Sequence, residues 1–181
     1  MTRRADFYFE EPALASRVRP VLARLPLLAG DGIYIERCPG LRDRHGAVHA
    51  GAFVRERRIA LDCTAKEFPR VFVHELFHFV WLRAGNTRRR SYEQLLAAEL
   101  SARARGELGW SAEWRKQELR REDVARRTRR WREYCCESFC DSAAWLYSGV
   151  QSHDEFTLAE RFRGRRRRWF GGLMAARELS I

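Results

Sequence analysis

The chain has 181 residues, is 45% hydrophobic and contains 6 Trp and 11 Phe, which suits one folded domain and excludes disorder throughout. Its formal net charge is +11, which fits a nucleic-acid or acidic partner. However, Lys66 and Lys116 are the only lysines among its 35 Lys and Arg residues. Such an arginine bias is typical of a GC-rich genome, so total charge alone does not identify a partner.

The N-terminal stretch lacks the features of a secretion signal or a membrane span. No uninterrupted apolar run follows Arg3 and Arg4, and the stretch 21–30 is broken by Arg24 and Pro26. We therefore expect a cytoplasmic protein without a membrane-spanning helix. The five cysteines show no paired CxxC spacing, so neither disulfides nor a four-cysteine structural zinc site is expected.

The first third of the chain predicts a helix followed by a small antiparallel sheet. The helix is expected from about residue 12, with an interruption at Pro20, because proline lacks the amide hydrogen that a helix interior uses. Asp31-Gly32 indicates a turn before a strand at "IYIE". A polar loop (38–46) and a β-hairpin (47–54 and 57–63, around Arg55–Arg57) are expected to follow.

From residue 64 onward the pattern predicts helices. Thr64 and Glu67 fit a capping box, but proline is tolerated only at a helix start, so Phe68 or Pro69 is the expected first residue. Gly85 is the expected end. Later helices are expected over 91–108, from 111, over 128–149, and from the Ser152/Glu155 capping box onward, with an interruption at Gly171-Gly172.

The stretch "FVHELFHFVW" (72–81) places two histidines and a glutamate in an otherwise apolar helix. A helix turns about 100° and rises about 1.5 Å per residue, so His74 and His78 lie on one face, about 6 Å apart along the axis. Two imidazoles so placed can hold one cation. Glu75 points about 100° away from His74 and can reach a water on the metal as general base. The competing interpretation is a chance match of common residues.

A third ligand is expected in the helix that contains "CCESFCDSAAW". No H-x-x-G-x-x-H continuation follows His78, which disfavours a three-histidine site. Glu137 could complete a site of two histidines and one glutamate, with the fourth position open for water. Asp141, one turn on, could accept the outer N–H of a ligand histidine. The same two carboxylates could instead form a solvated acidic face.

Three cysteines flank this proposed ligand. Their thiols could bind metal themselves, but on a buried helix face cysteines are more often small core residues. They are Cys135, Cys136 and Cys140.

The pattern His74-Glu75-x-x-His78 followed by Glu137-x-x-x-Asp141 resembles the two-helix signature of gluzincin metallopeptidases, the thermolysin-like branch of the zincins. The order of a small antiparallel sheet, an HExxH helix and a Glu-bearing helix also resembles the compact ImmA/IrrE-type metallopeptidases. The resemblance covers about 48–82 and 130–148, less than half the chain. The separation of the two helices is longer than in the simplest members.

This resemblance implies an α+β, zincin-like fold, with a small antiparallel sheet packed on the HExxH helix and a second Glu-bearing helix, and extra helices. We expect residues 1–181 to form a single metallopeptidase domain, with a basic helical arm at about 152–181 that the resemblance does not cover. The resemblance also implies hydrolysis of a protein or peptide substrate. In zincins a strand at the sheet edge binds extended peptide, and here either 49–54 or 58–63 could serve. By the resemblance His74, His78 and Glu137 bind Zn²⁺, Glu75 is the catalytic base, and Asp141 supports a ligand histidine.

A hydrolase of this kind also needs a donor for the oxyanion that forms when water attacks the carbonyl. His153, Tyr147 and Tyr134 are candidates by their chemistry alone. Each could equally be an ordinary surface or core residue.

Arginines cluster at 88–90, 126–132 and 161–168, and the last run ends in aromatic residues. These runs could bind nucleic acid, but no helix-turn-helix, zinc-finger or RNA-recognition motif accompanies them. The alternative to a peptidase is therefore a non-catalytic zincin-fold protein that binds nucleic acid or an acidic protein through this surface. Glu75 favours the enzyme, because a purely structural metal site needs the ligands but not the base.

Overall fold

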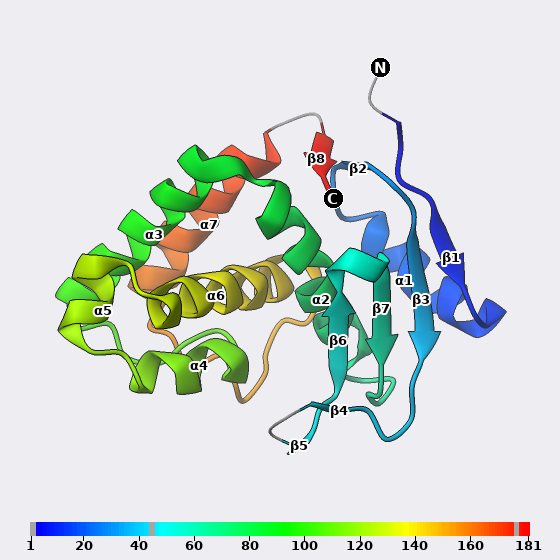
Figure 1. Ribbon diagram of the computed structural model, residues 1–181, viewed down its shortest axis with the longest axis horizontal. Coiled ribbons are helices and arrows are strands. Elements are labelled where there is room, and N and C mark those ends of the chain that lie inside the picture. Colours follow the sequence, from blue (N-terminus) through cyan, green and yellow to red (C-terminus); the bar gives the residue numbers. More distant parts are fainter. Residues whose placement is uncertain (1–2, 44–45, 176–177) are drawn as a thin grey trace.

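The computed structural model describes residues 3–43, 46–175 and 178–181, which form an α+β fold. Figure 1 shows a small sheet on one side, a group of helices on the other, and α2 (Phe68–Arg83) between them. Within the described part of the chain, no helix has both the length and the apolar character needed to cross a bilayer.

The main sheet is mixed, so the prediction of an antiparallel sheet was wrong. Its strand order is β1-β3-β7-β6; the first three strands run parallel, and β6 pairs antiparallel with β7 at one edge. The sequence did not reveal the short first strand, which precedes α1 and pairs in parallel with β3. The other parallel pair arises because the second strand of the hairpin, β7, and not β6, lies next to β3. The strands are β1 (Phe7–Phe9), β3 (Ile33–Arg37), β6 (Ala50–Phe53) and β7 (Arg58–Leu61).

The predicted hairpin is present as β6 and β7. Its two strands are connected by the 3-10 helix η1 (Val54–Glu56) and by Arg57. The backbone of Arg57 is in the left-handed conformation, with φ 54°. The polar loop contains β4 (Arg42–Asp43) and β5 (Gly46–Ala47), which pair antiparallel. Residues 44–45 of that predicted loop lie outside the described residues.

Residues near the two ends of the chain form a separate two-stranded ladder. Strands β2 (Leu27–Ala29) and β8 (Glu178–Ser180) pair in parallel, and Leu179 is buried. The helix that precedes β8, α7 (Glu160–Met174), buries Phe170 and Leu173 in the main core. The C-terminal segment is therefore packed into the fold and does not extend from it as a separate arm.

Two predicted helix interruptions were wrong. Helix α1 (Pro12–Leu22) continues through Pro20, because the proline lies in the last turn, where one missing hydrogen bond is tolerated. Helix α7 begins at Glu160 and continues through Gly171-Gly172. A β-carbon added at either glycine would meet no other atom within 4 Å. The remaining helices are α3 (Gly85–Ser101), α4 (Trp110–Gln117), α5 (Arg121–Arg126) and α6 (Arg129–Tyr147).

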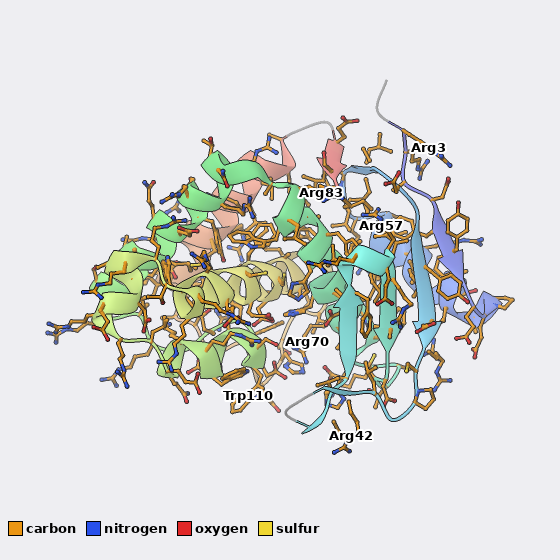
Figure 2. The ribbon with its side chains drawn as sticks, viewed as in Figure 1. Arg3, Arg42, Arg57, Arg70, Arg83 and Trp110 are labelled. Carbon is orange, nitrogen blue, oxygen red and sulfur yellow. The ribbon has the colours of Figure 1, made fainter. Side chains whose placement is uncertain are left out.

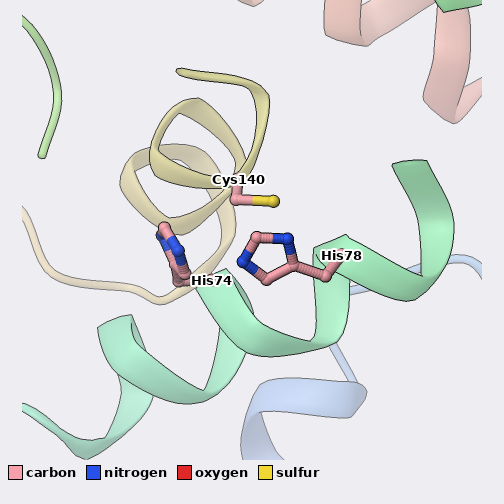
Figure 3. A group of neighbouring side chains, drawn as sticks. All are labelled: His74, His78 and Cys140. Carbon is pink, nitrogen blue, oxygen red and sulfur yellow. The ribbon is translucent and has the colours of Figure 1, made fainter. Parts of the chain in front are cut away.

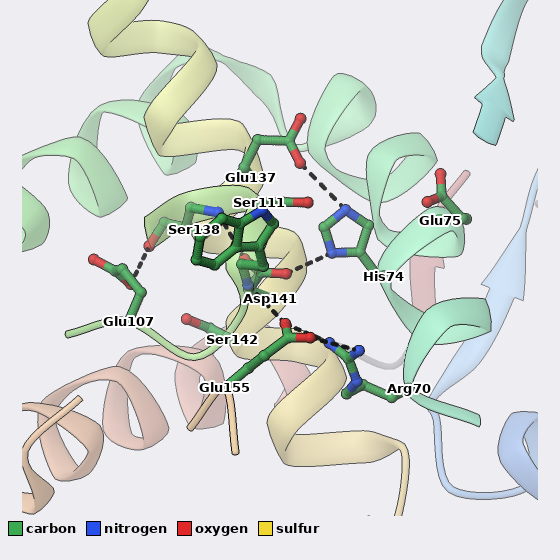
Figure 4. Close-up of polar contacts among 12 residues, drawn as sticks. Arg70, His74, Glu75, Glu107, Ser111, Glu137, Ser138, Asp141, Ser142 and Glu155 are labelled. Atoms are coloured by element: carbon green, nitrogen blue, oxygen red, sulfur yellow. Dashed lines mark hydrogen bonds and ion pairs between the residues drawn. The ribbon is translucent and has the colours of Figure 1, made fainter. Parts of the chain in front are cut away.

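Helix α2 is apolar on nearly every side because protein surrounds it. It contacts the sheet strands β6 and β7, the helix α1, and, most extensively, α6. Phe72, Phe77 and Phe79 are fully buried along it. Both of its histidines contact α6: His74 contacts Glu137 and Asp141 (Figure 4), and His78 contacts Cys136.

A second polar cluster lies on the other side of α6, inside the helical part of the fold. Arg166 is completely buried and forms ion pairs of 2.8 Å with Glu99 and 2.6 Å with Glu107. Lys116 and the Tyr134 hydroxyl also contact Glu107, at 3.1 and 2.6 Å. Burial alone would raise the pKa of Glu107, but the charge of Arg166 outweighs it and lowers that pKa to about 2. The carboxylate is therefore ionised and fully paired.

Candidate metal centre

The two helices that the sequence singled out meet at the candidate site. His74 and His78, one turn apart on α2, have ring centroids 5.1 Å apart. On α6, Glu137 points toward them: its Oε2 lies 3.2 Å from His74 Nε2 and 4.0 Å from His78 Nε2. One carboxylate oxygen thus faces both imidazole nitrogens, and Figure 4 shows the contact with His74. The three side chains are only 12 to 19% exposed.

Asp141 lies one turn further along α6 and contacts the other nitrogen of His74. The His74 Nδ1–Asp141 Oδ1 distance is 2.7 Å, which is the contact expected of a carboxylate that orients a ligand histidine. The second oxygen of Asp141 accepts a 2.9 Å hydrogen bond from the Ala112 backbone in α4. Asp141 is therefore held by a contact on each of its two oxygens. It occupies Nδ1 of His74, so Nε2 is the nitrogen that faces Glu137.

Gly109 offers a test of this anchor. A β-carbon at Gly109 would lie 2.2 Å from the Asp141 carboxyl carbon, although its extended φ of −178° suits any residue. Gly109→Ala is therefore expected to displace Asp141 from His74 and weaken zinc binding about 10- to 100-fold, measured by competition with a chromogenic chelator. Gly164→Ala, whose β-carbon meets nothing closer than 3.9 Å, is the matched control and should leave zinc affinity unchanged. Equal affinity in both variants would contradict the role of Asp141.

Two further residues contact the proposed ligands, and the sequence did not predict these contacts. Cys136 Sγ lies 3.4 Å from His78 Nδ1, so the outer nitrogen of His78 also has a partner on α6. Arg115 in α4 lies 3.5 Å from the other oxygen of Glu137. No sequence pattern links α4 to the HExxH helix, so only the fold reveals Arg115. Cys136 could have been found, because it is one residue from Glu137 on the same helix.

Cys140 also faces the histidines. Its sulfur and one ring nitrogen from each of His74 and His78 lie within 4.8 Å of one another. The site therefore has two candidates for a third ligand, the Glu137 carboxylate and the Cys140 thiol. The donor set of two imidazoles, a carboxylate and a thiol fits zinc, which binds nitrogen, oxygen and sulfur ligands.

Glu75 lies beside the proposed ligand His78. Its side chain is 11% exposed, and Oε2 is 4.0 Å from His78 Nε2. Figure 4 shows the Glu75 side chain separate from the His74–Glu137 and His74–Asp141 contacts. This position is compatible with a proton acceptor next to a metal, as its place on the helix predicts.

The acidic groups raise the pKa values of both imidazoles. Burial alone would lower them, but Asp141 contributes most to raising the pKa of His74 well above its usual value. Cys136 contributes most to raising the pKa of His78 to about 9. Without a metal, both rings are therefore cationic near neutral pH. Because a metal ligand must be neutral imidazole, metal binding displaces these protons and is expected to strengthen as pH rises.

The Glu137 carboxylate shows the complementary shift. Burial would raise its pKa, but the hydrogen bond from His74 and the charges of His78 and Arg115 outweigh it and lower the pKa to about 2. Glu137 is therefore an ionised acceptor at neutral pH, as a metal ligand must be.

The three predicted oxyanion donors have other partners. The Tyr134 hydroxyl donates to Glu107 in the buried cluster on the far side of α6. Tyr147 stacks on Phe77 at 5.9 Å, and His153 Nε2 lies 3.2 Å from Glu67. These contacts are with residues other than the proposed ligands, and the role of the three side chains as oxyanion donors stays a prediction. Arg115 is the donor that the structure places beside Glu137.

The arginine runs divide between ion pairs and the surface. Arg127 pairs with Glu93 at 2.6 Å, Arg129 with Glu133 at 2.7 Å, and Arg166 is buried. The arginines labelled in Figure 2 belong to none of these runs and are spread over several parts of the molecule, so basic residues are not confined to the runs. These observations do not single out one continuous basic surface.

Comparisons with known proteins identify no relative. No protein-family model matches the chain, and no curated protein or solved structure matches it either.

Proposed function

We propose that this protein is a zinc-dependent metallopeptidase of the zincin type, which hydrolyses peptide bonds in a protein or peptide substrate. The observation that carries the proposal is the position of Glu137 Oε2, 3.2 and 4.0 Å from the Nε2 atoms of two histidines on another helix. A carboxylate and two imidazoles facing one point form the three-ligand set of a catalytic zinc site.

Each proposed ligand is held by a partner of its own. Asp141 holds His74, Cys136 holds His78, and Arg115 lies beside Glu137. Such partners fix the orientation of ligands and are expected around a metal. A solvated acidic face would not account for them, because Asp141 is 3% exposed and Glu137 only 15% exposed.

Zinc bound there would polarise the scissile carbonyl and make water a stronger acid. Glu75 would accept the proton of the attacking water and pass it to the leaving amine, which is general base followed by general acid catalysis. The Arg115 guanidinium, 26% exposed, is available to stabilise negative charge that develops near Glu137. Its contact with Glu137 favours Arg115 over the three donors that the sequence suggested.

The sheet favours one of the two predicted substrate strands. Strand β7 is paired on both sides, by β3 and β6, so its backbone has no free edge. Strand β6 is the edge strand, contacts α2, and is only half-buried. Its small residues Ala50, Gly51 and Ala52 would allow an extended peptide to approach and pair by strand addition.

Metal analysis tests the proposal. Purified protein is expected to contain about one zinc ion per chain and to lose peptide hydrolysis on chelation, with recovery when zinc is returned. His74→Ala should lose the metal, whereas His49→Ala, at an exposed histidine just before β6, should keep it. Equal metal content in wild type and His74→Ala would refute the site. Full zinc content without hydrolysis of any peptide would leave a metal protein but refute the enzyme.

A further inference from the structure

Cys140 lies among the proposed ligands on α6. It is completely buried and follows Glu137 by three residues, so both side chains lie on the side of α6 that faces α2. Figure 3 shows its sulfur close to the rings of His74 and His78. Its sulfur and the two histidine nitrogens lie within 4.8 Å of one another.

Burial alone does not explain this position, as a second cysteine on the same helix shows. Cys135 is also completely buried, but its charged neighbours are Glu93 and Arg127, on another side of α6. Cys135 is thus an ordinary packing residue, whereas Cys140 is directed at two imidazoles. Its side chain also hydrogen-bonds that of Cys136, which contacts His78 Nδ1.

We propose that the Cys140 sulfur is a fourth protein ligand of the metal held by His74, His78 and Glu137, and that it excludes water in the resting protein. This inference rests on the proposed function, because it concerns the same metal. Zinc accepts sulfur, nitrogen and oxygen ligands, and sites with four protein ligands are closed. On binding, the Cys140 thiol proton is released to solvent and a metal–sulfur bond forms.

A closed site would restrain hydrolysis. Catalytic zinc sites keep one position for water, so the Cys140 sulfur would have to leave before Glu75 could act. Removal of this sulfur should therefore increase hydrolysis, unlike removal of any other ligand. A thiophilic metal would also be preferred over magnesium or calcium, which select oxygen ligands.

Cobalt(II) absorption tests the coordination directly. Metal-free wild type titrated with Co²⁺ should develop an intense near-ultraviolet sulfur-to-cobalt band together with the visible bands of tetrahedral cobalt. Cys140→Ser should keep the visible bands and lose the sulfur band. Cys135→Ser, the matched control on the same helix, should keep both. Cys136→Ser, at the thiol beside His78, tests whether that sulfur binds the cobalt instead.

The outcomes separate this inference from the proposed function. Visible cobalt bands without a sulfur band in wild type, or loss of the sulfur band in Cys136→Ser instead, would overturn the role of Cys140 and leave the metal site standing. No cobalt binding at all would overturn both. If Cys140→Ser does not fold, zinc-edge X-ray absorption of wild type decides, because a sulfur ligand gives a scatterer at about 2.3 Å.

The hydrolysis assay tests closure separately. Zinc-loaded Cys140→Ala should cleave a peptide library faster than zinc-loaded wild type, with Cys135→Ala as the control. An unchanged or lower rate, in a variant that retains one zinc, would overturn the closure. The cobalt band would still report whether the sulfur binds.

Discussion

Glu75→Gln is expected to lower peptide hydrolysis by about 10²- to 10⁴-fold, the usual contribution of a positioned general base. The amide has nearly the same shape as the carboxylate but cannot accept the proton of water. Because Glu75 is not one of the proposed ligands, zinc content should remain at the wild-type level. The measurement is kcat on a cleaved peptide, with zinc determined on the same samples.

The control is Glu133→Gln, at a carboxylate on the outside of α6 that is 44% exposed and pairs with Arg129. It should leave both hydrolysis and zinc content unchanged. Loss of zinc from Glu75→Gln would mean that Glu75 is a ligand. Retained hydrolysis would mean that another group accepts the proton.

Arg166→Met is expected to destabilise the protein by about 3–5 kcal/mol, because it leaves buried Glu99 and Glu107 without their main cation. Methionine keeps the apolar stem but leaves the guanidinium position unfilled, so a small cavity adds to the loss of the ion pairs. Urea unfolding of the metal-free variant and the metal-free wild type measures the difference.

Arg167→Met provides the comparison at the next position. Arg167 is 57% exposed, and its nearest carboxylate, 3.7 Å away, is exposed as well. Such surface pairs contribute little, so loss of Arg167 should change the free energy of unfolding by about 0.5 kcal/mol or less. A cost below about 1 kcal/mol for Arg166→Met would contradict the stabilising role of its ion pairs.

The sequence predicted the helices better than the sheet, for a physical reason. The HExxH helix and α6 have long apolar faces with clear ends, so their boundaries were close to those observed. The hairpin of β6 and β7 was also predicted, since two apolar runs flank a short polar turn. The strands Phe7–Phe9 and Glu178–Ser180 have only three residues each and pair with distant segments, so no local pattern marks them.

In the site, the spacing of residues along one helix was enough to predict which side chains share a face. The contacts between different helices could not be predicted in this way. The helical repeat placed His74 and His78 together and put Asp141 one turn beyond Glu137. The metal ligation and catalytic roles of these residues stay predictions. The sequence could not reveal that Arg115 reaches Glu137 or that His153 points to Glu67, because those contacts depend on where α4 and the 148–159 loop lie.

Helix α6 contributes side chains to both buried polar clusters. One side carries Glu137 and Asp141, while Tyr134 and Ser142 on another side contact the Glu107–Arg166 cluster. A ligand that binds only the folded protein stabilises it by mass action, so the proposed metal would be thermodynamically linked to folding of the domain that contains both clusters. Loosening the Arg166 cluster should therefore also make the metal easier to remove, although no atom of the cluster is a proposed ligand.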